Sequence, residues 1–298
     1  MIRQYKIHTN LDGTDDKIWD VTNGKVRFYQ PSNLGLQSTN NVWQSNGVGV
    51  MGTRSITQPQ IEFKLETFGE SLSENYQLMK DFVNDILNKK FVTLEYQTEI
   101  FQVYADLALA DVTKTEGYGK NGTFSEKITF DIITKWYTYE NLTFDMVQNG
   151  KVIAGKSKIY GGIAPGNYKY IKGTSYTYYG ESNIERLSRW DIKDKIFSFM
   201  GILYPKVPKT PTGVRFLDDI GNEYTAIVFK TEELQDYILI NTDVNDETYQ
   251  GWKGTTALNL FPVMDFERYR TRIIEKGQME LINLSKAEFK VKRKADFV

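Results

Sequence analysis

Residues 71–90 have the hydrophobic periodicity of an amphipathic helix, inside a chain whose other segments mostly alternate like strands. The apolar side chains of this stretch recur every three or four positions and form one stripe: Leu72, Tyr76, Met79, Phe82, Val83, Ile86 and Leu87. Ser71 and Glu74 form a capping box, which satisfies backbone amides at a helix start. Lys89 and Lys90 stand where cations complement the helix dipole. We therefore expect a helix over 71–90 whose apolar stripe packs across a sheet, followed at once by a strand at 91–96.

The segments on either side of this helix predict β-structure. A strand is expected at 61–69, and a long hairpin is expected from 100–116 and 123–140, because Asn121-Gly122 is typical of a tight turn. Alternation of apolar and polar residues at 128–132 indicates a strand with one solvated face. The pattern places a domain boundary at 136–140. It predicts an N-terminal domain of residues 1–137 and a C-terminal domain of residues 138–298.

The second half is longer than the ~100 residues of a simple β-sandwich, so we expect an insertion within 141–213. Residues 182–200 give an ambiguous helical signal. Three prolines of the sequence PKVPKTP, at 205, 208 and 211, suit a stiff polyproline II spacer. From residue 214 onward the pattern is β again. In the closing strand Phe289 and Val291 are expected to be buried. Its basic residues are expected on the outer face: Lys286, Lys290, Lys292, Arg293 and Lys294.

Residues 31–60 differ from the rest of the chain in composition, because Asn, Ser, Gln and Gly surround isolated apolar residues. The segment is too long for an ordinary connection and too apolar for a simple linker. It is either a flexible surface loop or an arm that becomes ordered against a neighbouring subunit. Gly47, Gly49 and Gly52 fit the spacing G-x-G-x-x-G, but β-branched residues and Pro59 follow, so no helix could receive a pyrophosphate. We expect the glycines to let the arm lie flat against another chain.

Composition excludes several kinds of chemistry. The net charge of −1 provides no attraction to nucleic acid or anionic lipid. The absence of cysteine excludes disulfides, thiolate catalysis and cysteine-based metal sites. The single histidine, His8, cannot build a catalytic triad or a multi-histidine metal site. The N-terminus lacks the apolar core of a signal peptide, and no run approaches the ~18 apolar residues of a membrane span, so synthesis in the cytoplasm is expected.

Weaker motifs leave other functions open. Asp243, Asn245 and Glu247 resemble the start of a calcium loop, but the required glycine and distal glutamate are missing, so a solvated turn is expected. The Tyr-rich segment 168–179 suits either a stacking platform or cross-strand pairs. Several carboxylates could supply a glycosidase pair, although most should lie on the wet face of a sheet: Glu62, Glu66, Glu95 and Asp131.

The alternative functions are therefore a carbohydrate-binding module or a glycosidase acting on cell-surface glycans. A pore-forming toxin would insert the hairpin of residues 100–135. Charged residues near the hairpin tip favour water over lipid: Lys114, Glu116, Lys120 and Glu126.

The order of these elements resembles a known family. The first half resembles the N-terminal domain of phage distal tail proteins in the order of its elements: a strand, the helix at 71–90, the strand at 91–96, the hairpin through Asn121-Gly122 and the strand that follows it. These are hub proteins of long, non-contractile tails, and the sequence most resembles members from lactococcal siphophages. The closing residues 277–294 are similar to the end of the family's second domain, a galectin-like β-sandwich. Residues 141–213 match least.

The resemblance implies a mainly β fold: an N-terminal β-sandwich hub domain with one helix and a long hairpin, then a galectin-like sandwich that carries an insertion. It implies that residues 31–60 are an inter-subunit belt and that the protein is a structural component of the virion, at the tail tip or baseplate. The implied partners are five further copies in a homo-hexameric ring, the major tail tube protein, the tail-associated or tail fibre hub protein, and receptor-binding proteins that mediate host attachment.

From this resemblance we expect the oligomer interface to include Trp43, Val48, Val50 and Tyr118. We expect partner docking at Trp190, Tyr204 and Pro208. Residues 137–298 contain no histidine, so the sugar-reading cluster of galectins does not carry over, and the second domain is expected to be a docking scaffold. No enzyme activity, catalytic residue, cofactor, metal site, nucleic-acid sequence recognition or membrane insertion is expected.

Overall fold

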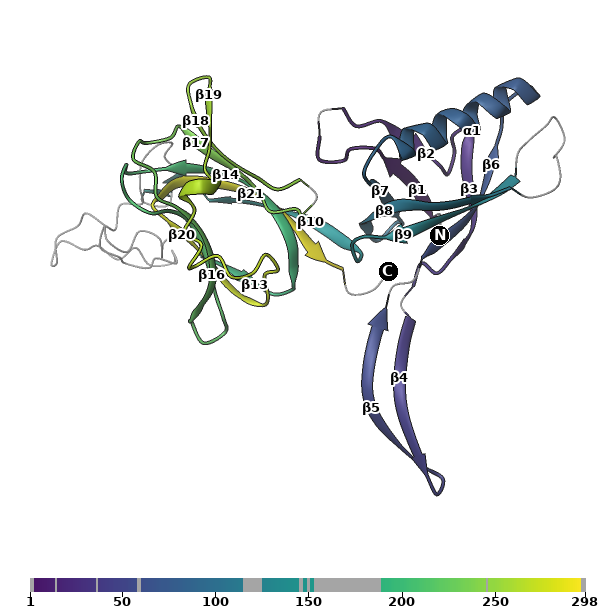
Figure 1. Ribbon diagram of the computed structural model, residues 1–298, viewed down its shortest axis with the longest axis horizontal. Helices are drawn as coiled ribbons and strands as arrows, with labels where there is room; N and C mark the ends of the chain where they lie inside the picture. Colours follow the sequence, from purple (N-terminus) through teal and green to yellow (C-terminus); the bar gives the residue numbers. More distant parts are fainter. Residues whose placement is uncertain are drawn as a thin grey trace. The chain divides into compact units, whose positions relative to one another are not determined.

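A computed structural model describes residues 3–13, 15–35, 37–57, 60–114, 125–144, 147–148, 151–152, 189–244 and 246–295. Within these ranges the chain is mainly β with one α-helix, which confirms the predicted fold class (Figure 1). The chain divides into two compact units, one of Met1–Thr138 with Ala295–Val298 and the other of Tyr139–Lys294. β10 (Tyr137–Phe144) runs from the first unit into the second.

The first unit is built on an antiparallel sheet in the order β2-β1-β7-β8-β9-β6-β3. Its strands are β1 (Gln4–His8), β2 (Ile18–Asp20), β3 (Val26–Ser32), β6 (Ile61–Thr67), β7 (Val92–Gln97), β8 (Gln102–Thr113) and β9 (Ser125–Ile132). Side chains of β6 alternate between buried and half-buried, and Ile61, Phe63 and Leu65 enter the core, as the two-residue period of a strand requires. The predicted hairpin corresponds to β8 and β9, while its turn at 115–124 lies outside the described residues.

Helix α1 (Leu72–Leu87) packs against β3 and β6. Its N-cap is Ser71, whose Oγ accepts from the Glu74 amide at 3.2 Å, as the capping box predicted. Phe82 is fully buried, and the rings of Trp19 and Phe28 contact it edge-on. Replacing a buried phenylalanine of this kind by alanine typically costs about 3–5 kcal/mol, so Phe82 is the main anchor of the helix.

Two expectations about this helix were wrong. The helix ends at Leu87, before Lys89 and Lys90, and the ammonium of Lys89 pairs with Asp15 instead. The predicted stripe is also only partly buried, because the side of the helix that faces the core is the side of Asn75, Phe82 and Ile86. The other part of the stripe is uncovered: Leu72, Tyr76 and Leu87 are 56%, 62% and 61% exposed.

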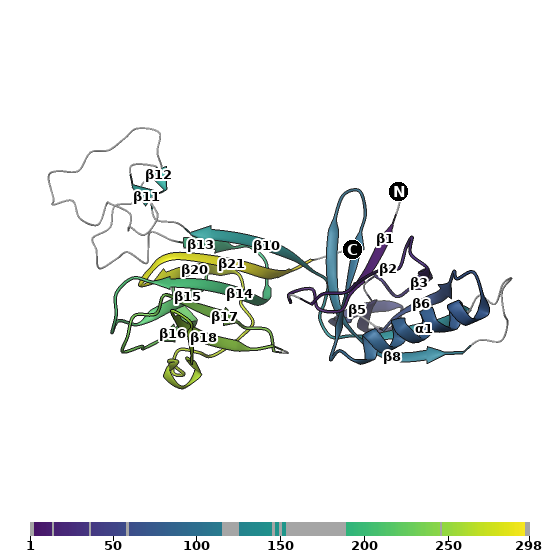
Figure 2. The ribbon, with the colours of Figure 1, turned by 90° about the horizontal axis from the view of Figure 1, so that it is seen from above.

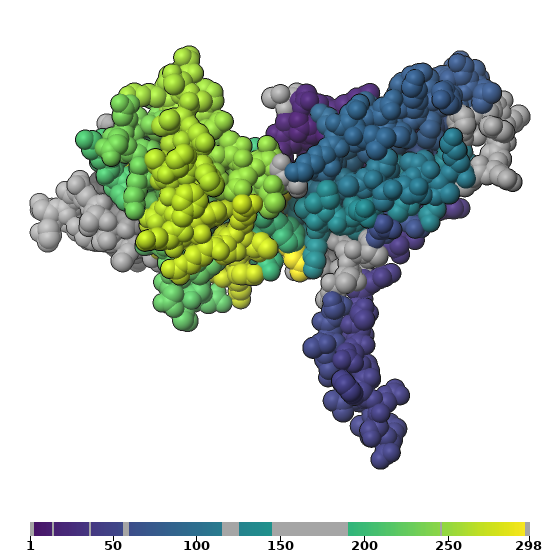
Figure 3. Space-filling model, viewed as in Figure 1, coloured from purple at the N-terminus to yellow at the C-terminus, as the bar shows by residue number. Residues whose placement is uncertain are grey.

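Residues 37–57 form a separate two-stranded ribbon of β4 (Gln37–Ser45) and β5 (Val48–Thr57). These strands pair with each other and with no other described strand. The flexible-loop alternative was therefore wrong, because residues 37–57 form a β-hairpin, while an arm that packs against a neighbouring subunit stays a prediction. Figure 3 shows its side chains as a narrow column of atoms.

The second unit is a sandwich of two antiparallel sheets (Figure 2). One sheet has the order β19-β18-β17-β14-β21-β10, and the other has the order β13-β20-β15-β16. Their strands are β13 (Arg189–Ile192), β14 (Ile196–Pro205), β15 (Thr212–Leu217), β16 (Glu223–Phe229), β17 (Tyr237–Asn241), β18 (Thr248–Lys253), β19 (Thr256–Asn259), β20 (Gly277–Ile282) and β21 (Leu284–Lys294). Short pieces are β11 (Val147–Gln148), β12 (Lys151–Val152) and the 3-10 helix η4 (Phe261–Val263).

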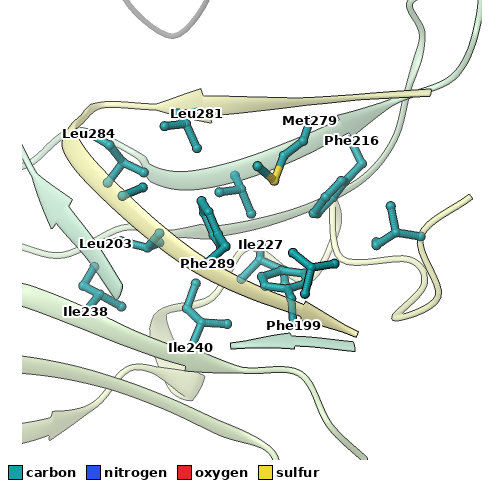
Figure 4. Close-up of a cluster of buried hydrophobic side chains, with 14 of the residues drawn as sticks. Phe199, Leu203, Phe216, Ile227, Ile238, Ile240, Met279, Leu281, Leu284 and Phe289 are labelled. Atoms are coloured by element: carbon teal, nitrogen blue, oxygen red, sulfur yellow. The ribbon is translucent and has the colours of Figure 1, made fainter. Parts of the chain in front are cut away.

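The core of this sandwich lies between the facing sides of the two sheets (Figure 4). Phe199 and Phe289 come from one sheet and Phe216 from the other, and the ring of Phe199 contacts both of the others with centroids 5.8 Å apart. Phe289 and Val291 are buried, which confirms the inward face predicted for the closing strand.

Three predictions for the second half were wrong. The described part of 182–200 consists of strands β13 and β14, because its branched and aromatic residues fit a half-buried sheet. Residues 206–211 are the connection between β14 and β15, not a spacer, and the side-chain amide of Asn283 donates to the Val207 carbonyl at 2.8 Å. Lys292 is buried instead of lying on the outer face of β21.

Candidate functional site

The ribbon of residues 37–57 is the first candidate site, and its turn explains why it forms. Asn46 and Gly47 have φ values of 49° and 82°. Positive φ at both central positions defines the type I′ turn, whose twist matches that of paired strands and which favours Asn-Gly. This dipeptide was a usable signal for a hairpin in the sequence, and the prediction missed it because the surrounding composition resembled a loop.

Both faces of the ribbon carry exposed apolar residues, and the face opposite Val42 and Met51 is the more exposed. Trp43 lies opposite Val50, and Ser45 lies opposite Val48, so the three predicted interface residues Trp43, Val48 and Val50 share one face, which we call the ribbon face. Trp43 is 68% exposed, and both valines are more than 60% exposed. A Cβ atom on Gly52 would come within 3.3 Å of the Trp43 indole nitrogen, so glycine leaves room for the indole there. Tyr118, the fourth predicted residue, lies outside the described residues.

The base of the ribbon is anchored to the first unit. Gln30, with φ of 49°, lies in the irregularity where β3 leaves its partner β6. Such irregularities bend a strand and redirect it. Leu34 packs partly buried against the core, and its carbonyl accepts from the Trp136 indole at 3.1 Å. The ribbon is thus fixed at its root while its outer part contacts nothing that would bury it.

The predicted docking residues lie on different parts of the second unit. Trp190 in β13 is half-buried and packs against the sandwich core. Tyr204 in β14 is half-buried, and the Lys286 ammonium stands 5.4 Å from its ring centroid. Pro208 is exposed in the β14–β15 connection. The structure therefore places the three residues in separate elements instead of in one cluster.

A groove of about 480 Å³ lies on the six-stranded sheet, close to Tyr204. Ile202, two residues before Tyr204, shares its side of β14 and lines the groove together with Met200 and Leu239. Glu288 and Lys290 of β21 supply charges at its edge. An apolar floor with a few charged groups is typical of a surface that receives a side chain or a small ligand. Sequence inspection missed this groove because its lining comes from several strands.

A buried charge cluster was also missed. His8 of β1 is 5% exposed, and its Nδ1 and Nε2 lie 2.6 Å and 2.8 Å from carboxylate oxygens of Asp16 and Glu95. Glu95 of β7 is 4% exposed and also accepts from the Lys6 ammonium at 2.9 Å. The prediction that Glu95 lies on a wet face was therefore wrong. No local signal could have found this site, because His8 and Glu95 are 87 residues apart.

The cluster shifts the pKa values of its members. Burial alone would lower the pKa of His8, but the hydrogen bonds to Glu95 and Asp16 outweigh burial and raise that pKa above 6.5. The hydrogen bond with His8 is the main reason that the pKa of Glu95 falls to about 2, although burial opposes the shift. The arrangement holds the His8 ring between two carboxylates, which favour its protonated form, and ties the segment before β2 to β1 and β7.

We expect the stability of the first unit to fall at both ends of the pH scale. The His8 contribution is complete below 6.5 and is lost as pH rises through its raised pKa, while the Glu95 contribution is complete above 4.5 and is lost as pH falls towards 2. Urea midpoints measured across pH on the full chain should show both declines. His8→Gln should remove the alkaline decline. A wild-type midpoint that stays constant from pH 6 to 9 would contradict the assignment of a charged His8.

The remaining motifs have structural explanations. Asp243 pairs with the buried ammonium of Lys292 at 2.9 Å, so the chain supplies its own cation at the start of the calcium-like sequence. The Glu247 carboxylate accepts from Tyr249 and pairs with Arg272, and Asn245 lies outside the described residues. Glu62 pairs with Lys127. The tyrosine segment 168–179 lies outside the described residues.

The described residues contain neither a metal-binding cluster nor a helix that could span a membrane. No group of three or more histidine, aspartate or glutamate side chains there could hold a metal ion. No helix in those ranges is long and apolar enough to cross a membrane. An exposed apolar face such as that of the ribbon is typical of a surface that binds another protein.

Comparison with known proteins identifies the family. Residues 4–133 match the model of the distal tail protein N-terminal domain, and residues 135–298 match that of the Dit C-terminal domain. The distal tail proteins of Lactococcus phages p2 and SK1 are 94% and 90% identical over all 298 residues of both chains. The chain therefore belongs to the distal tail protein family, and it is a structural protein of the virion tail tip.

Solved structures agree with this family. A chain in the structure of the phage p2 baseplate, in its activated conformation with Ca, is 94% identical, with TM-score 0.79 over the full length of both chains. The Dit protein of phage SPP1, a hub of the adsorption apparatus in phages that infect Gram-positive bacteria, shares only 9% identity. Its TM-score of 0.54 over 99% of this chain and all of its own shows that the fold is common to distant members.

Proposed function

We propose that this chain is the hub of a phage baseplate, a hexameric ring that continues the tail tube and docks receptor-binding proteins for host attachment. The observation that carries the proposal is the ribbon face. Fully burying a large apolar side chain contributes about 1.5–3 kcal/mol, and Trp43, Val48 and Val50, which are 68%, 65% and 63% exposed, obtain only a minor part of this inside their own chain. A neighbouring subunit would supply the missing cover. The near-identity to a chain of the phage p2 baseplate supports the same assembly.

The two units have separate roles in this proposal. Residues 1–137 form the ring, contact the major tail tube protein and the tail-associated hub protein, and carry the belt in residues 31–60. Residues 138–298 face outward as a galectin-like domain with an extension within 141–213. The groove beside Tyr204 and the exposed Pro208 are surfaces on which a receptor-binding protein can dock. The hub works by binding alone, without enzyme activity.

Negative-stain imaging of the purified full chain tests the proposal. We expect six-fold rings with a central channel, because a heterologous contact repeated with a closing rotation gives a ring. The rings should form from copies of this chain alone, without another protein. Images that show only single particles of the 34.5 kDa chain at micromolar concentration would contradict the ring.

A further inference from the structure

The turn between β4 and β5 places a reactive dipeptide, Asn46–Gly47, in open surroundings. The amide nitrogen of a glycine can attack the side-chain carbonyl carbon of an asparagine that precedes it, because glycine has no Cβ to obstruct the approach. Both residues are exposed, and a Cβ atom placed on Gly47 would meet nothing within 4 Å. The two reacting groups are therefore neighbours in the chain with free space around them, which favours an intramolecular reaction.

The hydrogen bonding of this turn leaves the Gly47 amide available. Ser45 lies opposite Val48, so Asn46 and Gly47 are the two central residues of the loop. In a four-residue turn the amide that donates across the turn belongs to the last residue, here Val48. None of the turn hydrogen bonds in the described part of the chain involves Gly47. Its peptide bond can therefore rotate towards the Asn46 side chain without breaking a turn bond.

A second Asn-Gly dipeptide, Asn23–Gly24, lies between β2 and β3 in closed surroundings. The Gly24 amide donates to the Asp20 carbonyl at 3.0 Å. The Arg27 guanidinium donates to the Asn23 carbonyl at 3.3 Å, so both polar groups of that peptide bond are held. A Cβ atom on Gly24 would come within 2.3 Å of the Asp20 carbonyl oxygen. The chain thus carries the same dipeptide once in an open turn and once in a fixed one.

We propose that Asn46–Gly47 is a site of spontaneous modification, at which the asparagine side chain loses ammonia. The Gly47 amide nitrogen gives up its proton and attacks Cγ of Asn46. The new C–N bond closes a succinimide ring, the bond from Cγ to Nδ2 breaks, and Nδ2 leaves with a proton as ammonia. Water then adds to one of the two ring carbonyl carbons and breaks its bond to nitrogen, which yields aspartate or isoaspartate.

The two products have different consequences for the ribbon. Aspartate retains the turn, because Asp-Gly also suits a type I′ turn, and it adds a negative charge to the chain. Isoaspartate carries the main chain through the former side chain and lengthens the backbone by a methylene group. Since a two-residue loop fixes the register of its strands, this product should disturb the pairing of Ser45 with Val48. The modification is therefore a slow, irreversible change of the ribbon tip.

Peptide mapping of the full chain during incubation in mildly alkaline buffer tests the proposal. The peptide that contains Asn46 should convert to aspartate and isoaspartate about tenfold faster than the peptide that contains Asn23, because only the open turn lets the reacting atoms approach. After unfolding in guanidinium chloride, the two peptides should convert at similar rates, since both then carry the same free dipeptide. Equal rates in the folded chain would overturn the proposal. So would a folded chain that keeps Asn46 intact while the unfolded chain loses it.

Arg27→Ala checks the structural reason for the difference. This change removes the hydrogen bond to the Asn23 carbonyl, so conversion at Asn23 should accelerate while the rate at Asn46 stays the same. The matched variant Asn46→Gly should keep the hairpin, because Gly-Gly also suits the turn, and should leave the rate at Asn23 unchanged. A rate at Asn46 that rises with Arg27→Ala would contradict the proposal, because unfolding of the whole unit would then control the reaction.

Discussion

Replacing Trp43 with aspartate should convert the ring into monomers without loss of folded structure. Trp43 is 68% exposed and belongs to neither of the described hydrophobic cores, so its replacement leaves the intramolecular packing intact. A central tryptophan in an interface typically accounts for about 2–4 kcal/mol, and a carboxylate buried in its place would add a desolvation cost. Because every subunit contact would lose this amount, the whole ring should dissociate.

Light scattering and urea unfolding together check this prediction. The Trp43→Asp chain should have a mass near 34.5 kDa, and the unfolding midpoint of the monomer should not depend on residue 43. Gln44→Asp is the matched control, because Gln44 lies on the opposite face of the same strand, across from Gly49. Rings that persist in Trp43→Asp would show that the ribbon face is not needed for assembly, and rings that dissociate in Gln44→Asp alone would show that the other face of the ribbon makes the contact.

The largest expected effect on stability comes from Glu95→Ala. This change leaves His8 buried beside Asp16 with one partner gone, and it removes the acceptor of the Lys6 ammonium. Breaking a buried pair by removing one member typically costs about 3–5 kcal/mol, because the remaining charge loses its compensation. The first unit should therefore unfold at a much lower urea concentration.

Urea unfolding of the full chain measures this loss, with Glu62→Ala as the control. Glu62 also pairs with a lysine across strands, but the side chains of that pair are 31% and 47% exposed. Partly exposed pairs contribute about 0–1 kcal/mol. Equal losses in the two variants would show that the buried cluster has no special role in stability.

Much of the first unit could be predicted from sequence, because its signals are local. The start of α1 follows from Ser71 and Glu74, and the hairpin of β8 and β9 follows from the Asn121-Gly122 turn together with the alternation at 128–132. The end of α1 was predicted too late, since Asn88 closes the helix and Lys89 turns towards Asp15. The side of the helix that faces the core could not be predicted from the stripe, because it depends on which helix residues contact β3 and β6.

The parts that failed depend on distant partners or on the absence of a core. Glu95 and Lys292 are charged residues in strands, and their burial depends on partners far away in the sequence: His8 and Lys6 for Glu95, and Asp243 for Lys292. The ribbon has no buried side to impose alternation, so its residues looked like a loop despite Asn46-Gly47. Trp43, Val48 and Val50 could be selected as interface residues, but their common face depends on the register of the two strands.

The mass of the purified chain, combined with protease protection of the ribbon, tests the central claim most directly. At micromolar concentration, light scattering should give six times 34.5 kDa, and residues 37–57 should resist cleavage in the ring but be cut in the Trp43→Asp monomer. A wild-type monomer whose ribbon is already protected from protease would contradict the account, because the ribbon would then be covered without a neighbouring subunit.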